Sequence, residues 1–217
     1  MPLGSEKNYD PFLIPRQEMV AQQLQGRGIS DQRVLDAMLR VPRHEFTPER
    51  YREQAYEDHP LPIGEGQTIS QPYIVANMLA ALSLQSMDKV LEVGSGSGYV
   101  TALLAELVAH VFAIERHAEL ATRARGTIAK LGYRNVEIVV GDGSRGLPLY
   151  QPFDAIIVSA AAERLPAPLL AQLADGGRMI IPVGAAEAQQ LQFIRMQEGI
   201  PQISLREPCR FVPLIAD

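Results

Sequence analysis

The residues best suited to chemistry are an acid and three glycines near the middle of the chain. Gly94, Gly96 and Gly98 follow a short apolar stretch. Glu92 lies two positions before the first of these glycines. Glycines at this spacing allow a tight turn and a close approach of the backbone to a ligand, and a helix that begins at the turn offers free N–H groups. We therefore expect the turn, including Ser95, to bind a ligand.

The spacing of these glycines separates two kinds of nucleotide cofactor. A dinucleotide site has the pattern G-x-G-x-x-G, which would require its third glycine at the position that Tyr99 occupies. The acid at Glu92 would repel a pyrophosphate, whereas it suits a cationic ligand such as an α-ammonium group. The pattern favours S-adenosylmethionine over NAD, with Glu92 beside the ammonium group.

Two further acids follow later predicted strands. Glu115 ends the second strand, where a carboxylate can accept hydrogen bonds from both ribose hydroxyls. Asp142 and Gly143 follow the third strand, and Asp142 is placed to accept a hydrogen bond from an adenine amino group. Taken alone, each acid also fits an ordinary solvated strand end or turn. Their order on successive strands is what supports the cofactor site.

A second polar segment runs from Gly64 to Pro72, directly before an apolar helical pattern. The hydroxyls of Thr68 and Ser70 and the backbone N–H groups would lie at the helix N-terminus, which attracts a carboxylate. The alternative is that Ser70 merely helps to cap the helix.

Hydrophobic periodicity indicates the elements that carry these segments. We expect strands over 89–93, 110–115, 136–140, 154–159 and 178–183, and helices over 99–107, 119–131 and 167–173. Such alternation predicts an α/β, Rossmann-like, doubly wound and mostly parallel sheet with helices on both faces. Extended stretches over 190–197 and 203–213 are expected to complete the sheet as strands.

Helical spacing also marks the N-terminal part of the chain. We expect helices over 16–25 and 31–39, the second capped by Asp31, and a further helix that begins at Pro72. Residues 41–67 are rich in proline and glycine and are expected to form a long irregular loop of functional importance.

We predict one domain over residues 1–217. In it, residues 1–15 are poorly ordered, 16–71 form a helical cap with the active-site loop, and 72–217 form the cofactor-binding core with the C-terminal strands.

Composition and charge exclude several classes of function. The net charge is −5, and no cluster of Lys and Arg suggests a nucleic-acid partner. No run of apolar residues is long enough for a membrane span, and the first residues lack the apolar part of a signal peptide. Cys209 is the only cysteine, and no histidine has metal-ligand spacing, so we expect neither disulfide nor metal. We expect a cytoplasmic protein without an obligate protein partner.

From about Arg16 to Ile215, the chain resembles the protein-L-isoaspartate O-methyltransferases. The matching segments are Val41–His44, Pro62–Gly64, Gly66–Pro72, Leu91–Gly98, Gly141–Gly143, Gly176–Arg178, Ile181–Gly184 and Arg210–Leu214. The sequence Gly-Gln-Thr-Ile-Ser, which ends at Ser70, is typical of this family, whereas many methyltransferases share the glycine-rich turn. Glu65 is a departure, because the family more often has His or an aromatic residue there.

The resemblance implies the reaction and its partners. Ser70 would be the active-site serine, and Thr68 and Ile69 would line the same pocket and contact the cofactor. Such enzymes methylate the α-carboxylate of L-isoaspartyl residues, and more weakly of D-aspartyl residues, in damaged proteins and peptides. The methyl ester closes to a succinimide, whose hydrolysis restores some normal aspartate.

Two alternatives share the predicted fold: a methyltransferase for RNA or a small molecule, and a non-catalytic cofactor-binding protein. Residues 160–162 are all alanine and lack the Asn/Asp-Pro-Pro-aromatic segment seen in enzymes that methylate nucleobase amino groups. The segment Arg210–Leu214 suits either strand addition with a substrate peptide or an ordinary buried strand.

Overall fold

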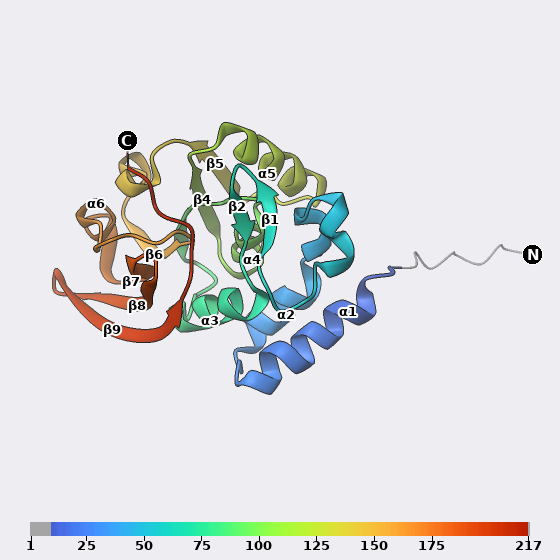
Figure 1. Ribbon diagram of the computed structural model, residues 1–217. Coiled ribbons are helices and arrows are strands. Elements are labelled where there is room, and N and C mark those ends of the chain that lie inside the picture. Colours follow the sequence, from blue (N-terminus) through green and yellow to red (C-terminus); the bar gives the residue numbers. More distant parts are fainter. Residues whose placement is uncertain (1–9, 217) are drawn as a thin grey trace, which may run out of the picture.

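The computed structural model describes residues 10–216. A seven-stranded sheet has the strand order β5-β4-β3-β6-β7-β8-β9 (Figure 1). Its strands are β3 (Lys89–Val93), β4 (His110–Glu115), β5 (Val136–Val140), β6 (Phe153–Val158), β7 (Leu173–Ala185), β8 (Ala188–Gln197) and β9 (Ile200–Cys209). Neighbours from β5 to β7 pair in parallel, and β8 and β9 are antiparallel additions. This confirms the predicted mostly parallel α/β sheet.

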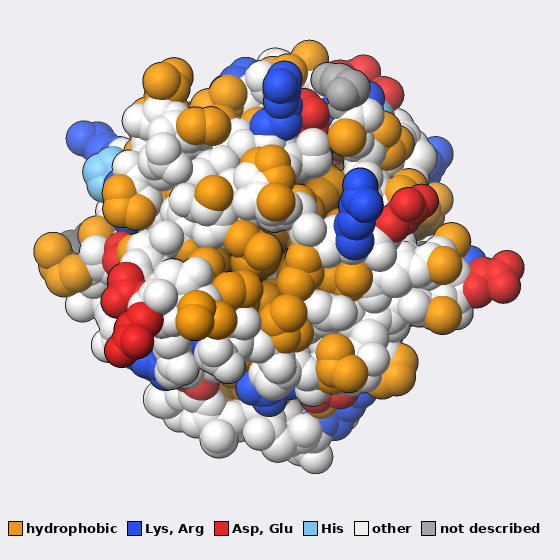
Figure 2. All heavy atoms as spheres, turned by 90° about the vertical axis from the view of Figure 1, so that its left-hand side faces the viewer, with side chains coloured by type: hydrophobic (Ala, Val, Ile, Leu, Met, Phe, Trp, Pro, Cys, Tyr) orange, Lys and Arg blue, Asp and Glu red, His pale blue; other side chains and the backbone are white. Residues whose placement is uncertain are grey.

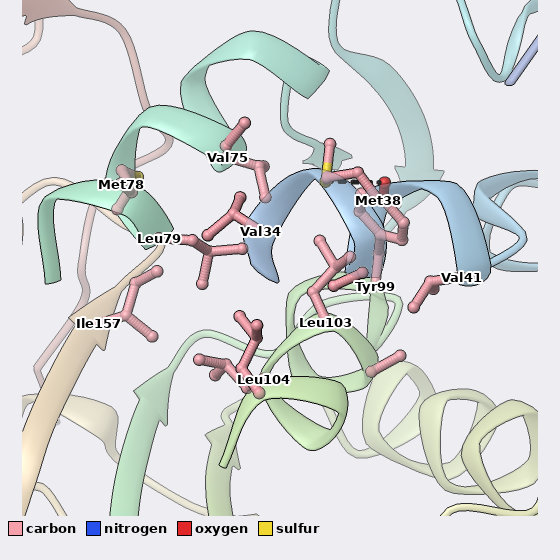
Figure 3. Close-up of a cluster of buried hydrophobic side chains, with 14 of the residues drawn as sticks. Val34, Met38, Val41, Val75, Met78, Leu79, Tyr99, Leu103, Leu104 and Ile157 are labelled. Atoms are coloured by element: carbon pink, nitrogen blue, oxygen red, sulfur yellow. Dashed lines mark hydrogen bonds between the residues drawn. The ribbon is translucent and has the colours of Figure 1, made fainter. Parts of the chain in front are cut away.

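The two faces of the sheet are covered unequally. The helices α2 (Gln32–Arg40), α3 (Pro72–Leu82), α4 (Tyr99–Leu107) and α5 (Ala118–Lys130) all contribute to one buried cluster. Figure 3 shows side chains of α2, α3 and α4 meeting Ile157 of β6 in this cluster. The opposite face is covered by α6 (Ala167–Leu170) and by the short 3-10 turn η6 (Pro148–Tyr150), and a second such turn, η5 (Gly143–Arg145), contacts α6. Helices therefore lie on both faces, as predicted, although one face carries most of them.

Several expected boundaries differ from the structure, most of them by one to three residues. The strand β7 begins at Leu173 rather than at 178, because Leu173 pairs with Phe153 before a register shift. As a result, the helix α6 ends at Leu170. The strand β9 ends at Cys209, before the expected end at 213. This strand forms one edge of the sheet and exposes Ile203 and Leu205. Figure 2 shows the side of the molecule that lies on the left in Figure 1, and hydrophobic side chains gather there.

The N-terminal cap consists of short helical elements. It comprises α1 (Leu13–Glu18), a π-helical turn η1 (Met19–Leu24) and a 3-10 turn η2 (Gln25–Arg27) before α2. Arg16 pairs with Asp10 at 2.5 Å, and the Phe12 ring stacks on His44 at 4.2 Å. The expectation of poor order stays a prediction for residues 10–15, and residues 1–9 lie outside the described residues. Asp31 caps α2 as predicted, because its side chain accepts hydrogen bonds from the backbone N–H groups of the first turn.

The segment 41–67 is not the irregular loop that its prolines and glycines suggested. It contains the 3-10 turns η3 (Arg43–Phe46) and η4 (Glu49–Gln54). The strand β1 (Leu61–Gly64) then pairs with β2 (Gln67–Ile69) as a separate two-stranded antiparallel sheet. The hairpin reverses at Gly64, Glu65 and Gly66, which all have positive φ angles. These glycines therefore mark a hairpin turn and not the absence of structure.

Two kinds of feature are missing from residues 10–216. No helix there is long and apolar enough to cross a membrane. No group of three His, Cys, Asp or Glu residues there is arranged to hold a metal ion.

Candidate active site

The carboxyl ends of β3 and β4 open onto a cavity that the hairpin β1–β2 helps to enclose. In parallel α/β sheets this is the edge at which ligands bind. Most of the predicted cofactor residues line it: Thr68, Ile69, Glu92, Gly94, Ser95, Gly96, Glu115 and Gly143. Ser70 lines it as well. The structure therefore brings together segments that lie far apart in the sequence.

The first two glycines of the turn line the cavity, whereas the third allows two helices to pack closely. Gly94 and Gly96 line the cavity with φ angles of 84° and 52°. A Cβ atom on Gly96 would lie 3.2 Å from the Ile63 side chain of β1, so glycine allows the hairpin to close over the turn. Gly98 does not line the cavity. Its φ is 90°, and a Cβ atom there would lie 3.1 Å from Cβ of Ala124, so Gly98 lets α5 pack against the start of α4.

Glu92 is buried and carries an unpaired oxygen. Its Oε2 accepts a hydrogen bond from the Thr101 hydroxyl, whereas Oε1 has no hydrogen-bond partner within residues 10–216. Burial raises the pKa of Glu92 to about 8. The Ser95 hydroxyl is also buried without a partner in the described chain. Buried polar atoms normally have partners, so these two orphaned atoms on the cavity wall fit a polar ligand with a cationic group beside Glu92.

Glu115 joins the end of β4 to the glycine turn. Its Oε2 accepts from the Gly96 N–H and its Oε1 from the His117 N–H, both at 2.9 Å. Each carboxylate oxygen keeps a further lone pair. The side chain therefore fixes the turn and can still accept hydrogen bonds from ribose hydroxyls.

The structure does not place Asp142 on the wall of this cavity. Its Oδ1 accepts hydrogen bonds from the Ser144 N–H at 2.9 Å and from the Ser144 hydroxyl at 2.7 Å. The side chain thereby caps η5. Gly143 does line the cavity, and a Cβ atom there would lie 2.6 Å from the Val93 side chain. The contact with an adenine amino group thus stays a prediction.

A second cavity adjoins the first and shares part of its wall. Four residues line both cavities: Thr68, Ser70, Ser159 and Val212. The N-cap residue of α3 is Gln71, and no side chain makes a capping hydrogen bond there, so the Ser70 hydroxyl is not used to cap the helix. The two polar segments found in the sequence therefore meet where the two cavities join.

The C-terminal segment is the part of the site that sequence reasoning largely missed. Residues 212–215 line the first cavity, including Ile215, to which we assigned no role. The Ala161 N–H donates to the Val212 carbonyl at 2.8 Å, and the Leu214 N–H donates to the Ala161 carbonyl at 2.7 Å. This part of Arg210–Leu214 therefore pairs with its own chain after β6. The one feature of the sequence that could have identified this segment is its match to the family pattern.

Three other polar residues have no assigned role in the proposed site. His59 is exposed and lies 2.8 Å from Glu57. Cys209 is half-buried on the second cavity, where burial raises the pKa of its thiol to about 11. Glu65, at the tip of the hairpin, lies 3.6 Å from His117 of the cavity wall.

A mostly parallel sheet with an acid and a glycine turn at the end of its first parallel strand defines a class I S-adenosylmethionine-dependent methyltransferase. The family model described as protein-L-isoaspartate(D-aspartate) O-methyltransferase matches residues 15–217. The chain therefore belongs to the protein-L-isoaspartate(D-aspartate) O-methyltransferase family.

Individual relatives agree with this membership. A protein-L-isoaspartate O-methyltransferase of Koribacter versatilis (strain Ellin345) is 55% identical over 206 residues, which cover 95% of this chain and 93% of the relative. A solved Plasmodium falciparum protein of this kind, in complex with S-adenosyl-L-homocysteine, is 29% identical with a TM-score of 0.82, over 93% of this chain and 99% of that chain. Another solved protein-L-isoaspartate O-methyltransferase has a TM-score of 0.84 at 28% identity, and the match covers 91% of this chain and 65% of that longer chain. The protein is a methyltransferase that uses S-adenosylmethionine and acts on isoaspartyl residues of damaged proteins.

Proposed function

We propose that the protein starts the repair of damaged proteins by transferring a methyl group from a donor in the first cavity to an acceptor in the second. S-adenosylmethionine would occupy the first cavity, and the α-carboxylate of an isoaspartyl residue would enter the second. The observation that carries this proposal is the shared wall at Thr68, Ser70, Ser159 and Val212. A donor and an acceptor that meet at this wall would be close enough for direct transfer.

The first cavity would bind the methyl donor and orient it. When bound, S-adenosylmethionine supplies a methyl group activated on a sulfonium cation. Glu92 would ionise beside the α-ammonium group, and Glu115 would accept from the ribose hydroxyls. Gly94 and Gly96 let the backbone approach the ligand, and Thr68 and Ile69 close the cavity from the hairpin side.

The second cavity needs no general base. An aspartyl carboxylate has a reference pKa of about 3.9, so the attacking group is already ionised at neutral pH. The Ser70 hydroxyl can donate one neutral hydrogen bond, which orients the carboxylate without neutralising it. A tight cationic clamp on the attacking oxygen would instead weaken the nucleophile. We assign Ser70 this orienting role.

Replacing Ser70 with alanine tests this assignment. S70A should lower kcat on an isoaspartyl peptide by roughly 10²-fold, because one preorganised hydrogen-bond donor at the reacting group is lost. Its dissociation constant for S-adenosylmethionine should change little. The conservative variant S70T, which keeps a hydroxyl, is the matched control. Full activity of S70A would remove Ser70 from the mechanism.

We also propose that the protein works in the cytoplasm and without an obligate protein partner. A sequence with one cysteine, Cys209, suits a reducing compartment. Residues of one copy of the chain line both cavities, which supports this proposal.

A further inference from the structure

Arg43 is a buried cation that the reaction described above does not use. Its side chain is completely buried within the N-terminal cap, in the segment Val41–His44 that matches the family pattern. Within residues 10–216, no carboxylate lies within ion-pair distance of it. Burial lowers the pKa of the guanidinium from its usual value. Burying a charge without an ion-pair partner costs free energy, so we looked for a function that offsets this cost.

The contacts of Arg43 lead to both halves of the active site. Its Nε donates to the Ala55 carbonyl at 2.7 Å, and its Nη2 donates to the Ser70 carbonyl at 2.8 Å. The guanidinium also lies over the ring of Tyr99, 4.9 Å from its centre. Tyr99 is the first residue of α4 and lines the first cavity, directly after the glycine turn. One side chain therefore contacts the acceptor serine and the residue that follows the cofactor turn.

We propose that Arg43 is a positioning residue, which holds the main chain of Ser70 at a fixed place relative to the cofactor turn. The planar guanidinium donates in two directions at once, and its carbon lies over the Tyr99 ring. It acts on the Ser70 carbonyl, so the hydroxyl stays available to the substrate. This inference rests on the proposed role of Ser70.

Replacing Arg43 with lysine tests the geometry while keeping the charge. A lysine ammonium is a point charge without the planar fork, so it cannot hold both carbonyls and keep the contact with the ring. R43K should lower kcat by about tenfold or more, because a small misplacement of the acceptor group is costly for direct transfer. Its dissociation constant for S-adenosylmethionine should stay within about twofold, because Arg43 does not line the first cavity. R43Q, which removes the burial of charge, should show the same pattern.

Arg33 offers a matched control for the structural effect. It also donates to two backbone carbonyls, that of Leu84, just beyond the end of α3, and that of Leu107, the last residue of α4. R33K should lose stability without a change in kcat. If R43K and R43Q both fail to fold while R33K folds, Arg43 is a structural residue and the proposal is overturned.

A double-mutant cycle separates this proposal from the function on which it rests. If Arg43 acts through Ser70, adding R43K to S70A should lower kcat by less than about twofold. If R43K lowers kcat equally in the unchanged protein and in S70A, the proposed role of Arg43 is overturned and that of Ser70 is unaffected. Unchanged kcat in S70A alone would instead contradict the proposed function of the site.

Discussion

At the scale of single residues, the site depends on atoms that are left without partners. Glu92 Oε1 and Ser95 Oγ are buried, lack partners in the described chain, and belong to residues of the same cavity wall. Such atoms lower the stability of the empty protein and favour a ligand that completes their hydrogen bonds. These two atoms therefore support the proposed cofactor site.

Glu92 predicts a proton release on cofactor binding. Burial raises its pKa to about 8, so at pH 7 the carboxyl is mostly protonated in the free protein. An ammonium group beside it lowers the pKa, so binding at pH 7 should release a proton. The affinity for S-adenosyl-L-homocysteine should therefore rise as the pH increases toward 8, as long as the ligand keeps its ammonium group.

Calorimetry in buffers of different ionisation enthalpy measures this release. E92Q is the matched variant, since it keeps the size of the side chain and cannot ionise. We expect the unchanged protein to release close to one proton for each cofactor molecule bound, and E92Q to release none from this position. Equal proton release in both proteins would exclude Glu92 as the source.

The sequence predicted the individual site residues unevenly. Acids and glycines of the cofactor turn were identifiable because their spacing carries chemistry, and eight of the predicted contacts line the cavity. Gly98 and Asp142 do not line it, because a glycine at a helix start and an acid before a turn serve local packing and capping equally well. Val212 and Leu214 were not predicted as cofactor contacts, since apolar side chains at the end of a chain have no distinctive spacing.

At the scale of elements, the strands and helices around the cofactor turn were the most predictable. The ranges 89–93, 99–107, 110–115 and 136–140 agree with the structure at both ends. Buried parallel strands that alternate with amphipathic helices give a strong and repeated pattern. The hairpin β1–β2 was missed because its strands are short, and the start of β7 was missed because tertiary pairing with β6 determines it.

Gly98 gives a prediction about how α4 and α5 pack. An alanine there would be strained at a φ of 90° and would also press on Ala124, so G98A should lower the free energy of unfolding by about 2–3 kcal/mol. Gly132 has a similar φ of 84° but open space around it, so G132A should cost only about 1–2 kcal/mol. Urea unfolding monitored by circular dichroism measures both values. Equal losses would show that the Gly98 contact with α5 is unimportant.

At the scale of the whole molecule, cofactor binding should stabilise the fold. The cavity is formed by the hairpin, the sheet edge and the C-terminal segment together, so a ligand there binds only the folded chain. A ligand at 100 times its dissociation constant adds about 2.7 kcal/mol, which for a chain of this size raises Tm by roughly 5–10 °C. Differential scanning fluorimetry with S-adenosyl-L-homocysteine measures this shift. A shift that is the same in E92Q at equal ligand concentration would contradict the assigned cavity.

We propose that a methyl group moves directly from the donor in one cavity to the carboxylate in the other. The most direct test incubates the protein with methyl-labelled S-adenosylmethionine and two peptides that differ only in an isoaspartyl or an aspartyl residue. We predict a base-labile methyl ester on the isoaspartyl peptide, at least about tenfold more label than on its aspartyl partner, and the loss of that label in S70A. Label that appears equally on both peptides, or only on added RNA, would contradict the account.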